Sequence, residues 1–131
     1  MTSAKYRVLV AGAAEGPLLA LSEPLSLWGG LDPESGMIID RSHPEGEECV
    51  SGTVLYMSHG RGSSSSSSVL AESIRLGTGP SAIITSEIDS ILMTGALVAS
   101  LLYRRVCPVL CGPKPKGEWV EIDEFGTVTW R

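Results

Sequence analysis

A glycine- and serine-rich stretch between a strand pattern and a helical pattern constrains the fold of this chain most. It comprises Gly60–Gly62 and the six serines Ser63–Ser68. The apolar run Val54–Met57 precedes it, and an amphipathic helical pattern, Val69–Leu76, follows it. A helix start leaves backbone N–H groups without acceptors and carries the positive end of the helix dipole. This junction therefore suits an anion or a developing negative charge, and the hydroxyls add candidate bases or nucleophiles.

The serine run has an alternative interpretation as a flexible linker. Linkers join domains, whereas this run lies between a strand and a helix of one predicted core, where loops are normally short. The run lacks the Gly-Lys-Ser/Thr of a Walker loop and the second glycine of a nucleophile elbow. A serine hydroxyl is a poor base unless its alkoxide is stabilised, which the helix start, Arg61 or a nearby metal could do.

Length and charge narrow the class of protein. The 131 residues suit a single domain, 1–131, and the 43% apolar content is that of a globular chain. A net charge of −5 without a basic cluster argues against nucleic acid and anionic membranes as partners. The apolar pattern Ile91–Leu102 is too short to span a bilayer, and residues 1–7 contain no signal-peptide core. We therefore expect a cytoplasmic protein.

The first half of the chain predicts short strands joined by long loops. Strands are expected at Tyr6–Val10, Leu18–Leu21 and Met37–Ile39, with a loop of small residues at 11–17 and no helix. Trp28, Gly29 and Gly30 form either a plain turn or a second loop that faces a substrate, since paired glycines permit close approach of a ligand.

The second half predicts alternating strands and helices. Strands at Val54–Met57, Ala82–Thr85 and 109–110 alternate with helices at Val69–Leu76 and Ile91–Tyr103, which implies parallel pairing by right-handed crossovers. The second helix is apolar almost all round and should be buried, with Asp89 or Ser90 as its N-cap. A hairpin, 119–122 with 127–130, follows. The fold class is therefore α/β.

The cysteines and histidines give weaker signals. Cys49, Cys107 and Cys111 lack the spacing of a disulfide framework or of a complete metal site, and buried free thiols are the simplest interpretation of the last two. His59 lies close in sequence to Arg61, whereas His43 lies in a polar loop. A structural or solvated role is favoured for both, with catalysis as the alternative, and no Ser/His/Asp arrangement can be argued from spacing.

Several motifs, in order between Gly12 and Leu110, resemble the small subunit of the aconitase X family. They are Pro24–Gly36, Ile39-Asp40, Gly60–Ser65, Gly77–Ile83 and Thr94–Ala96. The resemblance implies the swivelling β/β/α domain of aconitase, with a mixed or barrel-like sheet, a βαβαβ unit and a C-terminal hairpin.

The resemblance also implies a hydro-lyase that is active only with a large subunit, which would bind the iron or iron–sulfur cluster. The swivel domain supplies a Gly-x-Gly-Ser-Ser loop whose first serine, here Ser63, is the general base. Gly62, Ser64 and Ser65 would bind the substrate carboxylate. Aconitase has an arginine where this chain has Ser65, so Arg61 or the large subunit would hold the carboxylate. Gly29 and Gly30 are further candidates for substrate contact.

Two branches of the family differ in substrate. One dehydrates cis-3-hydroxy-L-proline, giving Δ1-pyrroline-2-carboxylate, and the archaeal branch dehydrates 5-phosphomevalonate. The serine-rich loop and Trp28 resemble the hydroxyproline branch. The alternatives are the phosphomevalonate reaction and a non-enzymatic, anion-binding swivel domain.

Overall fold

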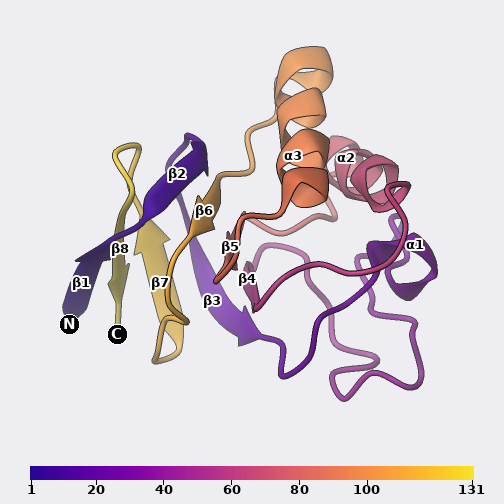
Figure 1. Cartoon of the computed structure of the whole chain (residues 1–131), viewed down its shortest axis with the longest axis horizontal. Helices are drawn as coiled ribbons and strands as arrows, with labels where there is room; N and C mark the ends of the chain where they lie inside the picture. The colour runs from indigo at the N-terminus through magenta and orange to yellow at the C-terminus, as the bar shows by residue number, and fades with distance from the viewer.

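Eight strands form one curled sheet, and two helices pack on one of its faces (Figure 1). The computed structural model describes all residues, Met1–Arg131. The strands are β1 (Thr2–Lys5), β2 (Arg7–Val10), β3 (Ala14–Ala20), β4 (Val54–Met57), β5 (Ala82–Thr85), β6 (Val109–Cys111), β7 (Trp119–Ile122) and β8 (Thr127–Trp130). The helices are α1 (Leu27–Gly30), α2 (Ser66–Leu76) and α3 (Ser90–Tyr103).

The strand order explains why the sheet curls. It runs β1-β8-β7-β3-β4-β5-β6-β2, so β1 and β2 lie at opposite ends of the order. Only Tyr6 separates these two strands in the sequence, and the two ends of the sheet must therefore approach one another. The Tyr6 side chain is buried, and its hydroxyl donates to the carbonyl of Pro113 at 2.6 Å. The sheet is thus nearly closed, as in a barrel.

The central strands β3, β4, β5 and β6 are parallel, and β4 and β5 are buried on both faces. Successive side chains of a strand point to opposite faces. In β4, Val54 and Tyr56 belong to the core inside the curl, whereas Leu55 and Met57 belong to the core beneath the helices. This two-sided burial accounts for the continuous apolar runs in the sequence.

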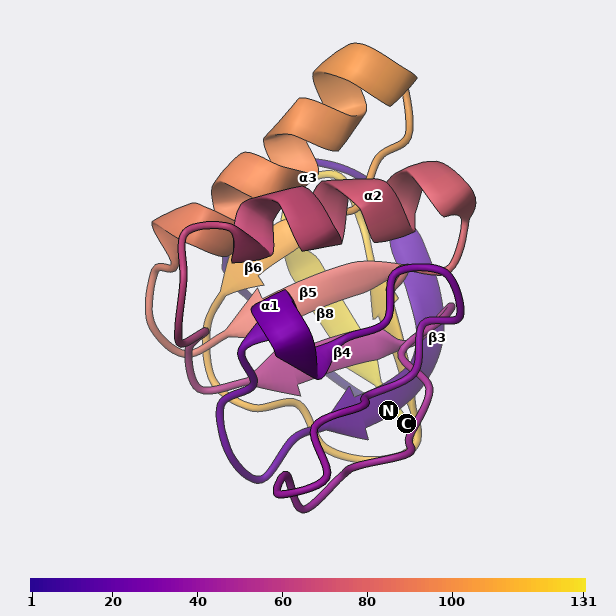
Figure 2. The same cartoon turned by 90° about the vertical axis from the view of Figure 1, so that its right-hand side faces the viewer.

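Helices α2 and α3 cover the outer face of the parallel strands (Figure 2). They approach closely because Gly95 has no side chain: a Cβ there would lie 2.7 Å from the carbonyl oxygen of Ser67. Gly77 ends α2 with a φ of 78°, a left-handed angle that glycine adopts readily. None of the helices has the length and hydrophobicity needed to cross a bilayer.

The α/β class, the βαβαβ unit and the C-terminal hairpin are confirmed. Helix α2 begins at Ser66, three residues before the predicted start, so Ser66–Ser68 form its first turn. Asp89 is the N-cap of α3, where its side chain accepts hydrogen bonds from two backbone N–H groups.

The prediction for residues 11–21 was wrong in its boundaries. Strand β3 begins at Ala14, inside the predicted loop, and ends at Ala20. Its first four residues pair with β7, and its last three pair with β4. Gly16 suits this place because a Cβ would lie 2.3 Å from the carbonyl oxygen of Gly52. Small residues here permit close packing of backbone rather than a loop.

Three other predictions in the first half need correction. The predicted strand Met37–Ile39 is reduced to isolated bridges to Leu31 and Cys49. The predicted strand Tyr6–Val10 begins only at Arg7. A short helix, α1, occurs where none was predicted, although Trp28 and Gly29 within it have non-helical backbone angles.

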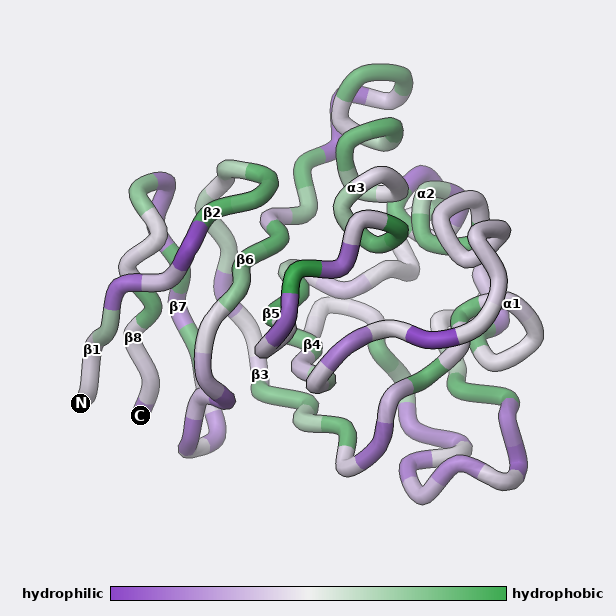
Figure 3. The backbone as a smooth tube through the Cα atoms, in the orientation of Figure 1, coloured by the Kyte–Doolittle hydropathy of each residue, from purple (hydrophilic) through white to green (hydrophobic).

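The expectation that the second helix is buried was also wrong. Only one face of α3 is buried, and its C-terminal part is exposed. Figure 3 shows this part as a largely hydrophobic segment that projects from the rest of the chain. Leu101 is 72% exposed and Leu102 68% exposed. The buried residues, which include Gly95 and Ala96, contact α2 and the sheet, whereas nothing in the chain covers the opposite face. Apolar composition alone did not distinguish these faces.

The cysteines offer a test of the core. All three are free thiols: Cys107 is buried as expected, Cys111 is only partly buried, and Cys49 is exposed. Burial raises the pKa of the Cys107 thiol to about 12. The thiolate is the reactive form. At about pH 8 we therefore expect iodoacetamide to modify Cys49 and to leave Cys107 intact until the protein unfolds, as measured by peptide mass spectrometry. A reaction in urea is the control, and modification of Cys107 in the native protein would contradict this packing.

Candidate functional site

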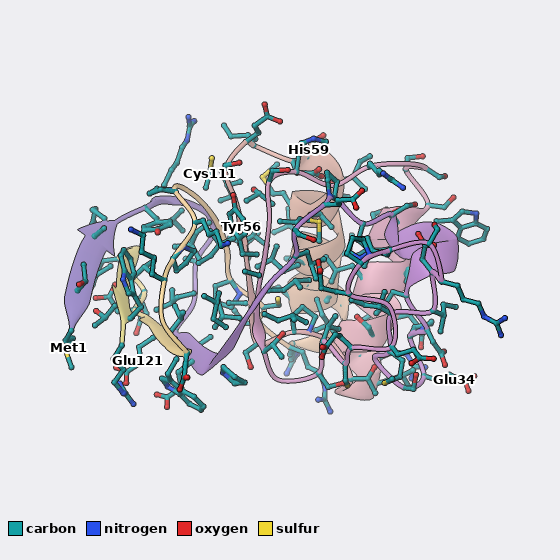
Figure 4. All side chains as sticks on the ribbon, turned by 90° about the horizontal axis from the view of Figure 1, so that it is seen from below. Met1, Glu34, Tyr56, His59, Cys111 and Glu121 are labelled. Carbon is teal, nitrogen blue, oxygen red and sulfur yellow. The ribbon has the colours of Figure 1, made fainter.

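The loops that follow β4 and β5 lie side by side at one edge of the sheet. The carboxyl ends of adjacent parallel strands meet there, as Met57 pairs with Thr85. The carbonyl of Ser58 accepts hydrogen bonds from the N–H groups of Ser86 and Glu87, at 3.1 and 3.2 Å. Figure 4 shows the labelled His59 and Cys111 along this edge. The glycine- and serine-rich loop is therefore built on the rigid, central part of the sheet.

Gly62 turns the chain into α2. Its φ is 89°, and a Cβ would lie 2.3 Å from the hydroxyl oxygen of Ser26. The next residue, Ser63, is exposed, and its hydroxyl oxygen accepts a hydrogen bond from the N–H of Ser65 at 3.1 Å. The carbonyl of Ser63 accepts from the N–H of Ser66 at 3.0 Å. Ser63 thus lies at the turn that starts the helix.

The loop that leads into α2 is open to an anion. The backbone N–H groups of Arg61, Gly62, Ser63 and Ser64 have no hydrogen-bond acceptor within the chain. All four residues are exposed, and no side chain caps the helix. Successive free N–H groups around a left-handed residue form a concave site for negative charge. The predicted anion-binding character therefore has a backbone arrangement that can supply it.

The second predicted loop lies next to the first. The N–H of Trp28 donates to the hydroxyl oxygen of Ser66 at 3.1 Å, which ties α1 to the start of α2. Trp28 is 59% exposed, and Gly29 is exposed with a φ of 81°. Gly30 is buried against Leu25, so it supports the loop from within. The structure thus brings the two candidate loops together but leaves only one of the paired glycines exposed.

Arg61 projects from the serine loop and lies near the loop that contains Asp40. The hydroxyl of Ser42 donates to Asp40 at 2.6 Å and is the main cause of a lowered pKa of that carboxyl group. The backbone N–H of Ser42 and the charge of Arg61 act in the same direction. A cationic side chain is therefore available beside the free N–H groups.

Neither histidine is hydrogen-bonded to a serine of the loop. The buried His43 contacts the carbonyl of Glu23 through Nε2 and accepts the N–H of Glu45 at Nδ1, so both ring nitrogens have backbone partners. His59 donates from Nδ1 to the carbonyl of Gly60 at 2.6 Å. These contacts fit the structural role favoured from the sequence.

No three His, Cys, Asp or Glu side chains converge as metal ligands, so the residues of this chain do not fit a metal centre.

Asp89 makes a second contact that the sequence did not reveal. The sequence marks it only as a candidate N-cap of α3. In the structure its carboxylate also accepts the N–H of Gly60 at 2.8 Å, from the neighbouring loop. This contact joins residues far apart in sequence, and no local pattern indicates it.

The conformation of Gly62 predicts a clear effect of substitution. Gly62→Ala should lower the free energy of unfolding by the cost of a left-handed alanine, about 1–2 kcal/mol, and by a further clash of about 1–3 kcal/mol with Ser26. Gly29→Ala is a matched control, because φ is also positive there but nothing lies within 4 Å of the added Cβ. Urea unfolding measures both variants, and equal losses would contradict the described packing.

Comparisons with known proteins agree with this geometry. A family model described as the aconitase X swivel domain matches residues 3–130. Cis-3-hydroxy-L-proline dehydratase from Pseudomonas aeruginosa is 44% identical over 124 residues, which are 95% of this chain but 20% of that protein. The phosphomevalonate dehydratase small subunit from Methanothermobacter thermautotrophicus is 39% identical, with 89% of this chain and 90% of that protein covered.

A solved structure has the same fold. The crystal structure of Thermococcus kodakaraensis aconitase X in its holo-form matches with a TM-score of 0.86 and 30% identity, covering 98% of this chain and 97% of that chain. The chain spans about a fifth of the length of the curated hydroxyproline dehydratases that it matches. The match along nearly the whole chain, with the predicted strand–loop–helix unit in place, shows that this protein belongs to the aconitase X swivel-domain family.

Proposed function

We propose that this chain is the small subunit of a dehydratase, a hydro-lyase, and that it supplies the general base Ser63 to a site shared with a larger subunit. The observation that supports this most directly is the exposed Ser63 hydroxyl among free N–H groups at the start of α2. Relatives of similar length are named small subunits of a dehydratase. The exposed apolar end of α3 is a surface of the kind that a partner protein covers.

In this proposal Ser63 removes a proton from the carbon next to the substrate carboxylate. Its exposed hydroxyl must first lose its own proton to solvent, and the N–H of Ser65 already points at that oxygen. A preformed donor at 3.1 Å stabilises the alkoxide without reorganisation during the reaction. The hydrogen bond that shapes the turn would therefore also raise the population of the reactive form of Ser63.

The same loop would hold the substrate. A carboxylate would be bound by the free N–H groups of Gly62 and Ser64, by Ser65 and by the side chain of Arg61. Gly29 and Gly30 would form the neighbouring wall, beside the exposed Trp28. Binding a carboxylate here would fix the adjacent carbon near the Ser63 oxygen, which is the geometry that proton abstraction needs.

Any iron or iron–sulfur cluster would be bound by the larger subunit, since the residues of this chain do not converge on a metal. Such a centre would supply Lewis-acid chemistry at the hydroxyl that leaves. The tasks of this chain are to bind the carboxylate, to carry the base and to exclude water when the two subunits close. A cytoplasmic location stays a prediction from the sequence.

We favour cis-3-hydroxy-L-proline as the substrate, with Δ1-pyrroline-2-carboxylate as the product. Two relatives named as cis-3-hydroxy-L-proline dehydratases, from Pseudomonas aeruginosa and Hypocrea jecorina, are 44% and 43% identical. The alternative is phosphomevalonate, because the small subunits that act on it match this chain in length as well as in sequence. The third possibility is a non-enzymatic, anion-binding domain, which would need no partner.

Substitution of the base is the first test. Ser63→Ala should lower turnover by about 10²–10⁴-fold, the range of a lost acid–base group, while the complex with the larger subunit still assembles. Ser68→Ala is the matched control, because Ser68 is an exposed serine in the first turn of α2, just beyond the loop that carries Ser63, and its hydroxyl makes no hydrogen bond. Steady-state kinetics and gel filtration measure both effects. Near-normal turnover of the Ser63→Ala complex would refute the assignment.

A substrate comparison separates the two reactions. The complex purified from the native source should dehydrate cis-3-hydroxy-L-proline and leave phosphomevalonate unchanged, as followed by chromatography of the products. The reverse result would move the protein to the phosphomevalonate reaction. Purification of the chain alone, without a partner and without turnover of either compound, would favour the non-enzymatic role.

A further inference from the structure

We propose that Asp89 is a positioning residue that holds the Ser63 loop in place from the neighbouring helix. The inference rests on the proposed function of Ser63. One carboxylate oxygen of Asp89, Oδ1, accepts the N–H groups of Ile91 and Leu92, at 3.1 and 2.9 Å, and caps α3. The other oxygen, Oδ2, accepts the N–H of Gly60 at 2.8 Å. A single side chain thus joins the start of α3 to the loop between β4 and α2.

The chemistry of this contact requires a carboxylate. Serine, asparagine and aspartate all cap helices well, since capping needs only one acceptor oxygen. The contact with Gly60 needs a second acceptor on the same side chain. An asparagine could keep its oxygen on the helix but would then present an N–H group to the N–H of Gly60. The cap of α3 and the tether to the loop can therefore be separated by substitution.

The position of Gly60 matches this contact. A Cβ on Gly60 would lie 2.7 Å from Oδ2 of Asp89, so the close approach depends on a glycine. Two residues later, Gly62 lies against Ser26 in the same way. The loop is thus held from α3 at one glycine and from the segment before α1 at the other, and Ser63 follows directly. A small pocket of about 160 Å³ between these supports is lined in part by Arg61 and Asp89.

Asp89 also decides which helix start can receive an anion. Helices α2 and α3 both begin near this edge of the sheet, and each start attracts negative charge. The carboxylate of Asp89 occupies the start of α3, whereas four N–H groups of the loop that leads into α2, those of residues 61–64, have no acceptor. The anionic group of a substrate is therefore directed to the N–H groups beside Ser63.

Hydrogen exchange tests the tether without reference to activity. In the full chain, Asp89→Asn should raise the exchange rate of the Gly60 amide about tenfold or more, while the amides of Ile91 and Leu92 change by less than about twofold. Asp123→Asn is the matched control: Oδ1 of Asp123 likewise accepts two N–H groups, from Phe125 and Thr127, in the distant β7–β8 turn. Unchanged exchange at Gly60, or equal acceleration along α3, would overturn the tether.

A double-mutant cycle tests positioning in the complex with the larger subunit. Asp89→Asn should lower kcat by roughly 10- to 100-fold, because small displacements of a reacting group are costly, and should raise KM in both backgrounds, because the same loop is proposed to bind the carboxylate. In the Ser63→Ala background the same substitution should lower kcat by less than about twofold, since there is no base left to position. Equal factors in both backgrounds would show a merely structural role and refute the inference.

The two measurements also separate this inference from the proposed function. If Ser63→Ala alone left turnover normal, Ser63 would not be the base, and the proposed function would fail. The exchange rate of Gly60 would still decide whether Asp89 holds the loop. If Ser63→Ala abolished turnover but Asp89→Asn changed neither kcat nor the exchange rate, the proposed function would stand and the role of Asp89 would be refuted.

Discussion

The parallel pairing of β4 with β5, buried on both faces, is the constraint on which the rest of the structure depends. Because both faces are covered, the strands cannot shift register without moving apolar side chains from one core to the other. Their carboxyl ends are therefore fixed relative to each other. The loops that leave these ends inherit that precision, which explains how a glycine- and serine-rich segment of flexible composition can have a defined conformation.

The sequence predicted those parts of the fold that depend on local periodicity. The strands β4 and β5 and the helix α2 were found because burial on two faces, or on one, leaves a pattern in neighbouring residues. Helix α3 was found from the length of its apolar run and its N-cap, without the burial of one face being recognised. The first half of β3 was missed because its partner, β7, lies near the other end of the chain. The exposure of Leu101 was missed because periodicity records which residues are apolar, and not what lies beside them.

The candidate site likewise has one part that the sequence predicted and another that it did not. The loop and its glycines could be named from the sequence, because a helix start after a strand has known backbone chemistry. Ser63 was singled out among the six serines only by the resemblance to the aconitase X family. The tether from Asp89 to Gly60 could not be predicted, since it joins two loops that meet only through the pairing of β4 with β5. The open start of α2 beside the capped start of α3 is likewise visible only in three dimensions.

The pairing of β1 with β8 has a consequence for how such a domain can be combined with others. Thr2 lies opposite Trp130, and Figure 1 shows the two ends of the chain next to each other, away from the serine loop. A longer polypeptide can therefore enter and leave the domain at a single point. Genetic fusion at this point would not disturb the sheet or its functional edge. This geometry is compatible with relatives in which the matched segment is about a fifth of one long chain and with others in which it is nearly the whole protein.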